Sequence, residues 1–395
     1  MSRVILLLSV ALPFLIACNP TQPAVLEAEL LFELQIGRLE HELGLFSREG
    51  VLPRRGNFLT LRDGIVFISN GSSNKMMGFT SYGDLLQLVY SPAENPRPVT
   101  LGEPSSTTDG RRITRRGVAF PFNQLERIAV DSRRILYAED RVSEERQVWD
   151  EDLQTTLNRQ ILRFDANGAP LDYLGQEGVG GTPFPFITGL QITLRDELVV
   201  TGITRNTHKV WVFSPAGELL STVRIGMDRL PVPALDAGYI TVLDNVVAGV
   251  DHYRVYLKFS YYRTVVEQTG GREQGISFDH SRVYWIDLTT GRYEGYIELP
   301  RQGETQAGEH FELLGATRGE YLLLLARIDE DRSQLVMVDT NGRVLRRRVL
   351  QIPERNLLVR SFHVTADGIL SALLAYPDRA EVVWWRSDRL LPGQS

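Results

Sequence analysis

A strand, a short polar turn and a second strand recur as one unit six times along this chain of 395 residues. The six copies occupy residues 77–86, 162–171, 210–219, 283–293, 336–344 and 382–390. Glycine stands in the turn of every copy except the last. Because a tight hairpin needs a residue with positive φ, which glycine adopts without steric cost, each copy predicts a β-hairpin.

A second pair of β-rich runs, joined by a polar turn, precedes each of these hairpins. The runs occupy residues 58–69, 127–138, 190–202, 239–259, 313–326 and 362–376. Two hairpins per unit make four strands, and almost no helical periodicity separates the units. Six consecutive four-stranded antiparallel units predict an all-β protein, a six-bladed β-propeller over residues 30–395, because blades around a central channel leave only short edges exposed.

Insertions and an incomplete last unit modify this plan. The units are roughly 50 to 60 residues long, above the usual propeller repeat of about 40 to 50. We attribute the excess to polar insertions at residues 90–119, 141–159 and 263–279. The last unit shows three strands, and we expect residues 30–36 to supply its outer strand and so to close the ring.

The N-terminus has the features of an export signal. Arg3 is followed by an apolar stretch over residues 4–17 that is too short to span a bilayer. The stretch ends in Leu15-Ile16-Ala17-Cys18, which resembles the lipobox of bacterial lipoproteins, and Cys18 is the one cysteine of the chain. We therefore expect a lipoprotein signal peptide at residues 1–17 and an acylated Cys18 with a linker to residue 29; a buried structural cysteine is the alternative.

Two further segments resemble known families. Residues 161–193, which include Asp165-Ala166-Asn167-Gly168 and a glycine-rich stretch, look like an NHL-type propeller repeat. Residues 61–68 and 81–86, followed by Asn95-Pro96, are similar to a poorly characterised family of bacterial lipoproteins with predicted propeller bodies. This resemblance implies the anchor and the fold together, and it implies no known chemistry.

The formal charge of −6 predicts that the protein does not bind nucleic acid, which is itself negatively charged. Two basic runs interrupt the acidic background, one at Arg111, Arg112, Arg115 and Arg116 and one at Arg346, Arg347 and Arg348. We interpret the first as an exposed loop and the second as a solvated strand. Contact with anionic lipid or with an acidic partner is the alternative for both.

No catalytic or cofactor motif stands out. The glycines of residues 175–181 precede no helix, so they predict a loop between blades rather than a phosphate site. The six histidines are scattered, and no Gly-x-Ser-x-Gly elbow is present. The pairs Trp384-Trp385 and Tyr261-Tyr262 are expected to fill blade interfaces, with recognition as the alternative role.

We expect no cofactor; a divalent cation such as Ca²⁺ is the alternative, because propeller channels can gather carboxylates from several blades. The carboxylates at strand ends are Asp131, Glu139, Asp140, Asp244 and Asp251. Among them, Asp131 and Asp251 are the weak candidates for metal ligands. Turn or rim positions are the simpler interpretation of all five.

These features favour a non-catalytic scaffold, anchored to a membrane of the cell envelope, that binds another envelope protein through the insertions at 90–119 and 141–159. Asn19 is not the aspartate that some bacteria use as a retention signal, which favours the outer membrane, with the propeller in the periplasm or at the cell surface. The first alternative is a divalent-cation-dependent hydrolase or lyase with its site in the channel. The second is a sensor of glycan or peptide.

Overall fold

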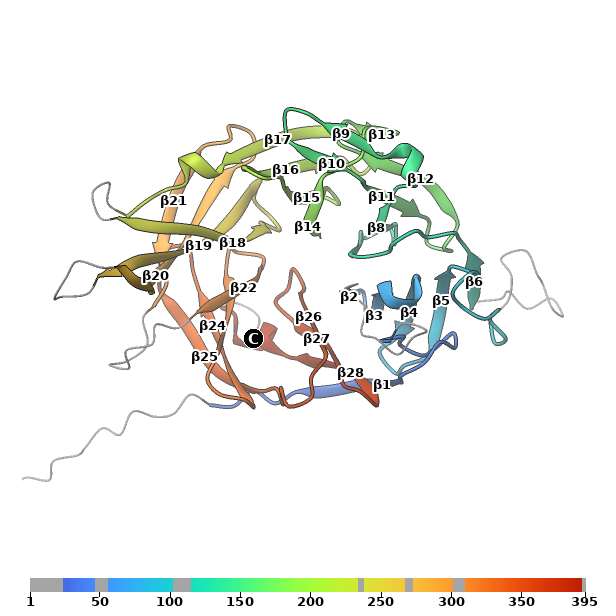
Figure 1. Cartoon of the computed structure of the whole chain (residues 1–395). Coiled ribbons are helices and arrows are strands. Elements are labelled where there is room, and N and C mark those ends of the chain that lie inside the picture. Colours follow the sequence, from blue (N-terminus) through green and yellow to red (C-terminus); the bar gives the residue numbers. More distant parts are fainter. Residues whose placement is uncertain are drawn as a thin grey trace, which may run out of the picture.

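Six antiparallel sheets follow one another around a central axis in the computed structural model, which describes residues 24–46, 56–101, 115–233, 238–266, 273–300 and 310–392 (Figure 1). Each blade has four strands in sequence order from the axis outwards, except that the outer strand of the last blade comes from the N-terminus. The first and second sheets carry a fifth strand at the outer edge. The innermost strands of neighbouring sheets contact one another all the way round. The predicted six-bladed β-propeller is confirmed.

The strands of the first three blades alternate with short turns. Blade 1 contains β2 (Asn57–Arg62), β3 (Ile65–Asn70), β4 (Lys75–Thr80) and β5 (Leu85–Tyr90), and β6 (Arg116–Ala119) pairs with β5 in parallel. Blade 2 contains β7 (Ile128–Val130), β8 (Leu136–Arg141), β11 (Arg159–Phe164), β12 (Pro170–Gly175) and the short β13 (Gly178–Val179). Blade 3 contains β14 (Phe186–Ile192), β15 (Leu198–Ile203), β16 (Thr207–Phe213) and β17 (Leu219–Gly226).

The other three blades complete the ring. Blade 4 contains β18 (Tyr239–Ala248), β19 (Arg254–Val266), β20 (Glu273–Asp287) and β21 (Tyr293–Glu298). Blade 5 contains β22 (Phe311–Ala316), β23 (Leu322–Arg327), β24 (Arg332–Val338) and β25 (Val344–Gln351). Blade 6 contains β26 (Val359–Val364), β27 (Leu370–Ala375), β28 (Arg379–Trp385) and β1 (Glu29–Gln35).

Five of the six repeated units are hairpins, as the turn glycines predict. Gly83, Gly168, Gly217, Gly291 and Gly342 have φ values from 67° to 94°. The sixth unit, residues 382–390, was wrongly expected to form a hairpin. It lacks the glycine, and β28 is followed by the 3₁₀ turn η4 (Ser387–Leu390) rather than by a returning strand. The outer position beside β28 is filled from elsewhere in the chain.

The N-terminal strand fills that position and closes the ring. β1 pairs antiparallel with β28, with Phe32 opposite Val382 and Gln35 opposite Arg379. Phe32 and Leu34 are buried in a cluster that also contains residues of blades 1 and 6, and the Phe32 ring lies 5.2 Å from that of Phe79. The prediction that residues 30–36 supply the missing strand is confirmed.

Apolar side chains fill every interface between neighbouring blades. Each middle strand is covered on both faces, which explains near-continuous apolar runs such as the Leu-Leu-Leu-Leu-Ala of β23. Trp385 and Tyr261 are fully buried, whereas Trp384 and Tyr262 retain some exposure. Each pair therefore places one ring in a blade interface and turns the other outward, in keeping with the period of two.

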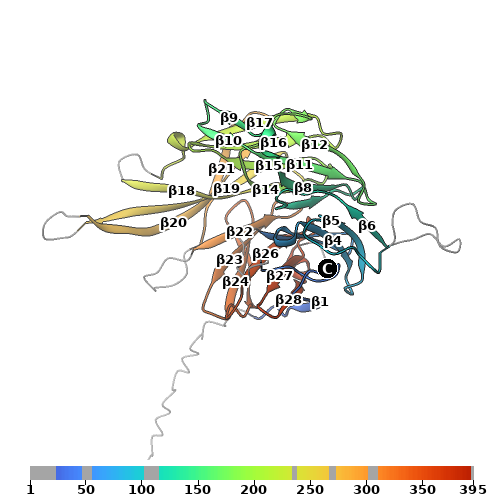
Figure 2. The same ribbon diagram turned by 45° about the vertical axis from the view of Figure 1, so that its right-hand side comes forward.

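The three insertions take different forms. Residues 141–159 contain a separate hairpin of β9 (Val148–Asp150) and β10 (Thr155–Leu157), and residues 90–119 contain β6 and a segment outside the described residues. Residues 263–279 continue β19 and β20 into a long arm that projects from the side of the ring (Figure 2). None of the helices in the described ranges is long and apolar enough to cross a membrane.

Candidate functional site

Asp131, one of the two weak metal candidates, is fully buried in the turn between β7 and β8. Its Oδ1 accepts hydrogen bonds from the backbone N–H groups of Arg133 (2.9 Å) and Ile135 (2.8 Å). Its Oδ2 lies 2.9 Å from Nη2 of Arg133, and this contact raises the pKa of that guanidinium. The carboxylate is therefore saturated by the turn that contains it.

Asp251, the other candidate, joins two blades. Its Oδ2 accepts a hydrogen bond from the backbone N–H of Gly319 in blade 5 (2.8 Å), and its Oδ1 lies 3.2 Å from Nδ1 of His252. In the part of the chain that the structure describes, no three His, Cys, Asp or Glu side chains are placed to hold a metal ion. Asp131 and Asp251 are thus placed as turn and inter-blade residues.

The remaining candidate carboxylates also form ion pairs or hydrogen bonds within the protein. Burial raises the pKa of Glu139, although Arg127 (3.0 Å) and Arg159 (3.6 Å) oppose this effect. Burial likewise raises the pKa of Asp140 to about 6, despite hydrogen bonds from the backbone N–H groups of Gln124 and Asn123. Asp244 accepts hydrogen bonds from Lys258 and Ser260 in its own blade. The five carboxylates therefore do not meet at one point.

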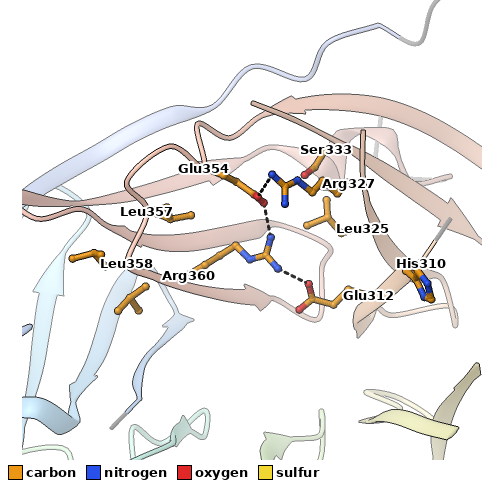
Figure 3. A pocket seen from close by; sticks show the side chains of 10 residues that line it. His310, Glu312, Leu325, Arg327, Ser333, Glu354, Leu357, Leu358 and Arg360 are labelled. Atoms are coloured by element: carbon orange, nitrogen blue, oxygen red, sulfur yellow. Dashed lines mark hydrogen bonds and ion pairs between the residues drawn. The ribbon is translucent and has the colours of Figure 1, made fainter. Parts of the chain in front are cut away.

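A cavity of about 350 Å³ opens between blades 5 and 6 (Figure 3). A chain of ion pairs forms its polar wall: Arg360 lies 3.1 Å from both Glu312 and Glu354, and Arg327 lies 3.1 Å from Glu354. Leu325, Leu357, Leu358 and Val359 form the apolar wall. A cavity with this lining can hold a small ligand that has both polar and apolar groups.

The arm presents a second, larger surface. Ile240 of β18 is paired with Tyr262 of β19, which is paired with Phe278 of β20, so the three side chains share one face. Val242 and Ile276 stand two residues from Ile240 and Phe278 and belong to the same face. We call these five residues the arm face. Ile276 is 61% exposed, and Ile240 and Val242 are also exposed.

His310 connects the arm face with the cavity. Its ring lies 4.3 Å from that of Phe278 and 6.1 Å from that of Tyr262, and the same side chain lines the cavity. The hairpin of β9 and β10 adds a separate exposed aromatic residue, Trp149, which is 56% exposed. A group of neighbouring exposed apolar side chains, such as the arm face, is typical of sites that contact other molecules, whereas a single exposed ring such as that of Trp149 is common at protein surfaces.

Sequence reasoning missed both the cavity and the arm face. The four charged residues of the cavity come from β22, β23, β26 and the connection before β26, and their spacing in the sequence carries no motif. Ile276 and Phe278 lay inside an insertion that we interpreted as polar. The glycine stretch at 175–181 does serve as a contact between blades, because Gly178 pairs with Glu218 of blade 3. Cys18, Arg111 and Arg112 lie outside the described residues.

No protein-family model and no curated protein matches the sequence. The structure is similar to that of a calcium-binding protein, regucalcin, from Agrobacterium tumefaciens, with a TM-score of 0.43 and 10% identity over 93% of this chain and 96% of that chain. It is also similar to an ulvan lyase of polysaccharide lyase family PL25 (TM-score 0.42, 10% identity, 92% and 84% covered) and to a streptogramin B lyase (0.38, 10%, 89% and 96%). At this level of identity, no activity carries over to this chain.

Proposed function

We propose that this protein is a lipid-anchored scaffold of the bacterial cell envelope that binds another envelope protein through the arm face. The exposure of Ile240, Val242 and Ile276 on a projecting sheet is the observation that supports binding. Exposed apolar side chains on a rigid support can bind a partner without a large loss of conformational entropy. The anchor at Cys18 is proposed from the lipobox-like sequence alone.

Capture of partners in the cell envelope tests this proposal. The full-length tagged protein is cross-linked in the bacterium of origin and compared with a double variant, Ile240→Ser with Ile276→Ser. Each change removes about 1 to 2 kcal/mol of apolar burial at an interface, so binding should weaken about 30-fold or more. Leu171→Ser is the matched control, because Leu171 is an apolar strand residue of blade 2 with 53% exposure. A partner retained equally by all three proteins would contradict the arm face as the binding site.

The cavity supports a second proposal, a sensor of peptide or glycan. Its two arginines and two glutamates offer hydrogen-bond groups beside a wall of leucines, and His310 places it next to the arm face. Arg360→Ala, added to the same capture experiment, separates the two proposals. Loss of the partner in Arg360→Ala but not in the arm variant would favour recognition through the cavity.

A further inference from the structure

The N-terminal chain meets the propeller at the outer strand of blade 5. The carbonyl of Ala24 accepts a hydrogen bond from the N–H of Val349 (3.1 Å), and the N–H of Leu26 donates to the carbonyl of Val349 (2.9 Å). Val25 and Val349 form a parallel bridge. Because the two segments run parallel, the chain enters this contact from the side of β25 on which Arg346, Arg347 and Arg348 lie.

Chain length places this edge of the molecule close to the anchor. Cys18 precedes Ala24 by six residues, which span at most about 20 Å when fully extended. Part of the predicted linker is thus fixed against β25 and adds no further reach. An acylated Cys18 would hold the outer edge of blade 5 near the membrane surface, whatever the path of the residues between them.

β25 carries a concentration of positive charge that the other outer strands lack. We call Arg346, Arg347 and Arg348 the arginine rim. Among the described outer strands, β6 and β17 have one arginine each, and β1, β5, β12, β13 and β21 have none. The arginine rim therefore occurs on the blade edge that residues 24–26 contact.

Two arginines of the rim are not neutralised by the described protein. Arg346 is exposed and donates a hydrogen bond to the carbonyl of Leu345. Arg348 donates to the carbonyl of Arg347, and neither guanidinium forms an ion pair with a carboxylate of the described residues. Arg347 donates to Gln334. Asp339, in the turn before β25, accepts hydrogen bonds from the backbone N–H groups of Asn341 and Arg343 in its own turn.

We propose that the arginine rim lies on the anionic headgroup surface of the membrane that holds Cys18, so that blade 5 faces the lipid and blade 2 faces away from it. This inference rests on the lipid anchor proposed above. Each arginine close to an anionic surface favours the bound orientation by about fivefold, so Arg346 and Arg348, which share one face of β25, together favour it by roughly 25-fold. The attraction weakens as salt screens the charges.

A matched pair of reporter positions tests the orientation. Asn341 in blade 5 and Asn167 in blade 2 are exposed residues at the same place in the repeat, Asp-x-Asn-Gly, and Figure 1 shows β25 and β12 on opposite sides of the ring. Asn341→Cys or Asn167→Cys adds a single free thiol, since the sulfur of Cys18 is alkylated in the anchored form. The purified full-length protein is labelled there with a fluorophore and placed in vesicles that contain headgroup-quenching lipid.

In vesicles of phosphatidylcholine with phosphatidylglycerol, the label at position 341 should be quenched and the label at 167 should not. The quenching at 341 should fall to the level seen in phosphatidylcholine alone when Arg346, Arg347 and Arg348 are changed to Gln, or when the ionic strength is raised. Two results would contradict the proposed orientation: equal quenching at both positions, or quenching at position 341 that is unchanged when the three arginines are replaced by Gln.

Mass spectrometry of the same preparation separates the two proposals. If Cys18 carries no acyl chains, the anchor is refuted and the orientation with it. If Cys18 is acylated but the labels at 341 and 167 respond alike, only the orientation is refuted. Unchanged melting of the Gln variant confirms that its loss of quenching reflects lost charge and not lost structure.

Discussion

Aspartates at strand ends serve the backbone of this protein. Asp131, Asp165, Asp287 and Asp339 each accept hydrogen bonds from backbone N–H groups two to four residues further along the chain. Such turns are a common use of aspartate. The same residue type at the same place also suits a calcium site, so the sequence alone could not separate the two roles. The hydrogen bonds around Asp131 favour the turn.

Removal of the Asp131 carboxylate should therefore destabilise the fold without any involvement of metal. We expect Asp131→Ala to lower the free energy of unfolding by about 1 to 3 kcal/mol, because two backbone N–H groups and the half-exposed Arg133 guanidinium lose the buried carboxylate that closes the turn. Urea denaturation measures this loss, with Asp228→Ala as an exposed control.

Calcium provides the opposing test. A ligand that binds only the folded state must raise its melting temperature. Because we expect no Ca²⁺ to bind at Asp131 or Asp251, the wild-type protein should melt at the same temperature with and without Ca²⁺. A calcium-dependent rise that disappears in Asp131→Ala or Asp251→Ala would show that the cation-dependent alternative is right.

Strands and hairpins were the most predictable level of this structure. The turn glycines and the period of two placed most of the strands, because each hairpin carries its own turn chemistry. Even the closing strand was visible, since residues 30–36 alternate like the strands that they join. The arm was not visible, because exposed polar residues such as Arg263 and Ser277 conceal the continuation of β19 and β20.

Closure by β1 should contribute strongly to stability. Phe32 is 8% exposed and packs against Phe79 across the junction of the first and last blades. We expect Phe32→Ala to cost about 3 kcal/mol of unfolding free energy, the lower end of the range for buried phenylalanine. Glu33→Ala, one residue along the same strand and exposed, should change it by less than about 0.5 kcal/mol. Similar losses in both variants, measured by chemical denaturation, would show that closure does not depend on this core.

Assembly of the ring creates the surfaces that single segments do not encode. Arg327, Glu354 and Arg360 meet only because blades 5 and 6 pack side by side, and Ala24 meets Val349 only because the N-terminus crosses from one blade to the next. No spacing in the sequence records such contacts. At this scale the molecule has two separate surfaces, the arm face on blade 4 and the arginine rim on blade 5.

Shortening the arm should abolish partner binding by the arm face and leave membrane contact by the arginine rim unchanged. Residues 263–277 are replaced by Asn-Gly, a two-residue turn suited to the paired Tyr262 and Phe278. The ring should unfold at nearly the same temperature, because the removed residues that the structure describes are exposed or half-buried and lie beyond the pairing of β20 with β21. Capture of the envelope partner should be lost, while quenching of the label at Asn341→Cys in anionic vesicles should persist. A folded, shortened protein that still retains its partner would exclude the arm tip from the interface, and a loss of both signals would mean that arm and rim act as one surface.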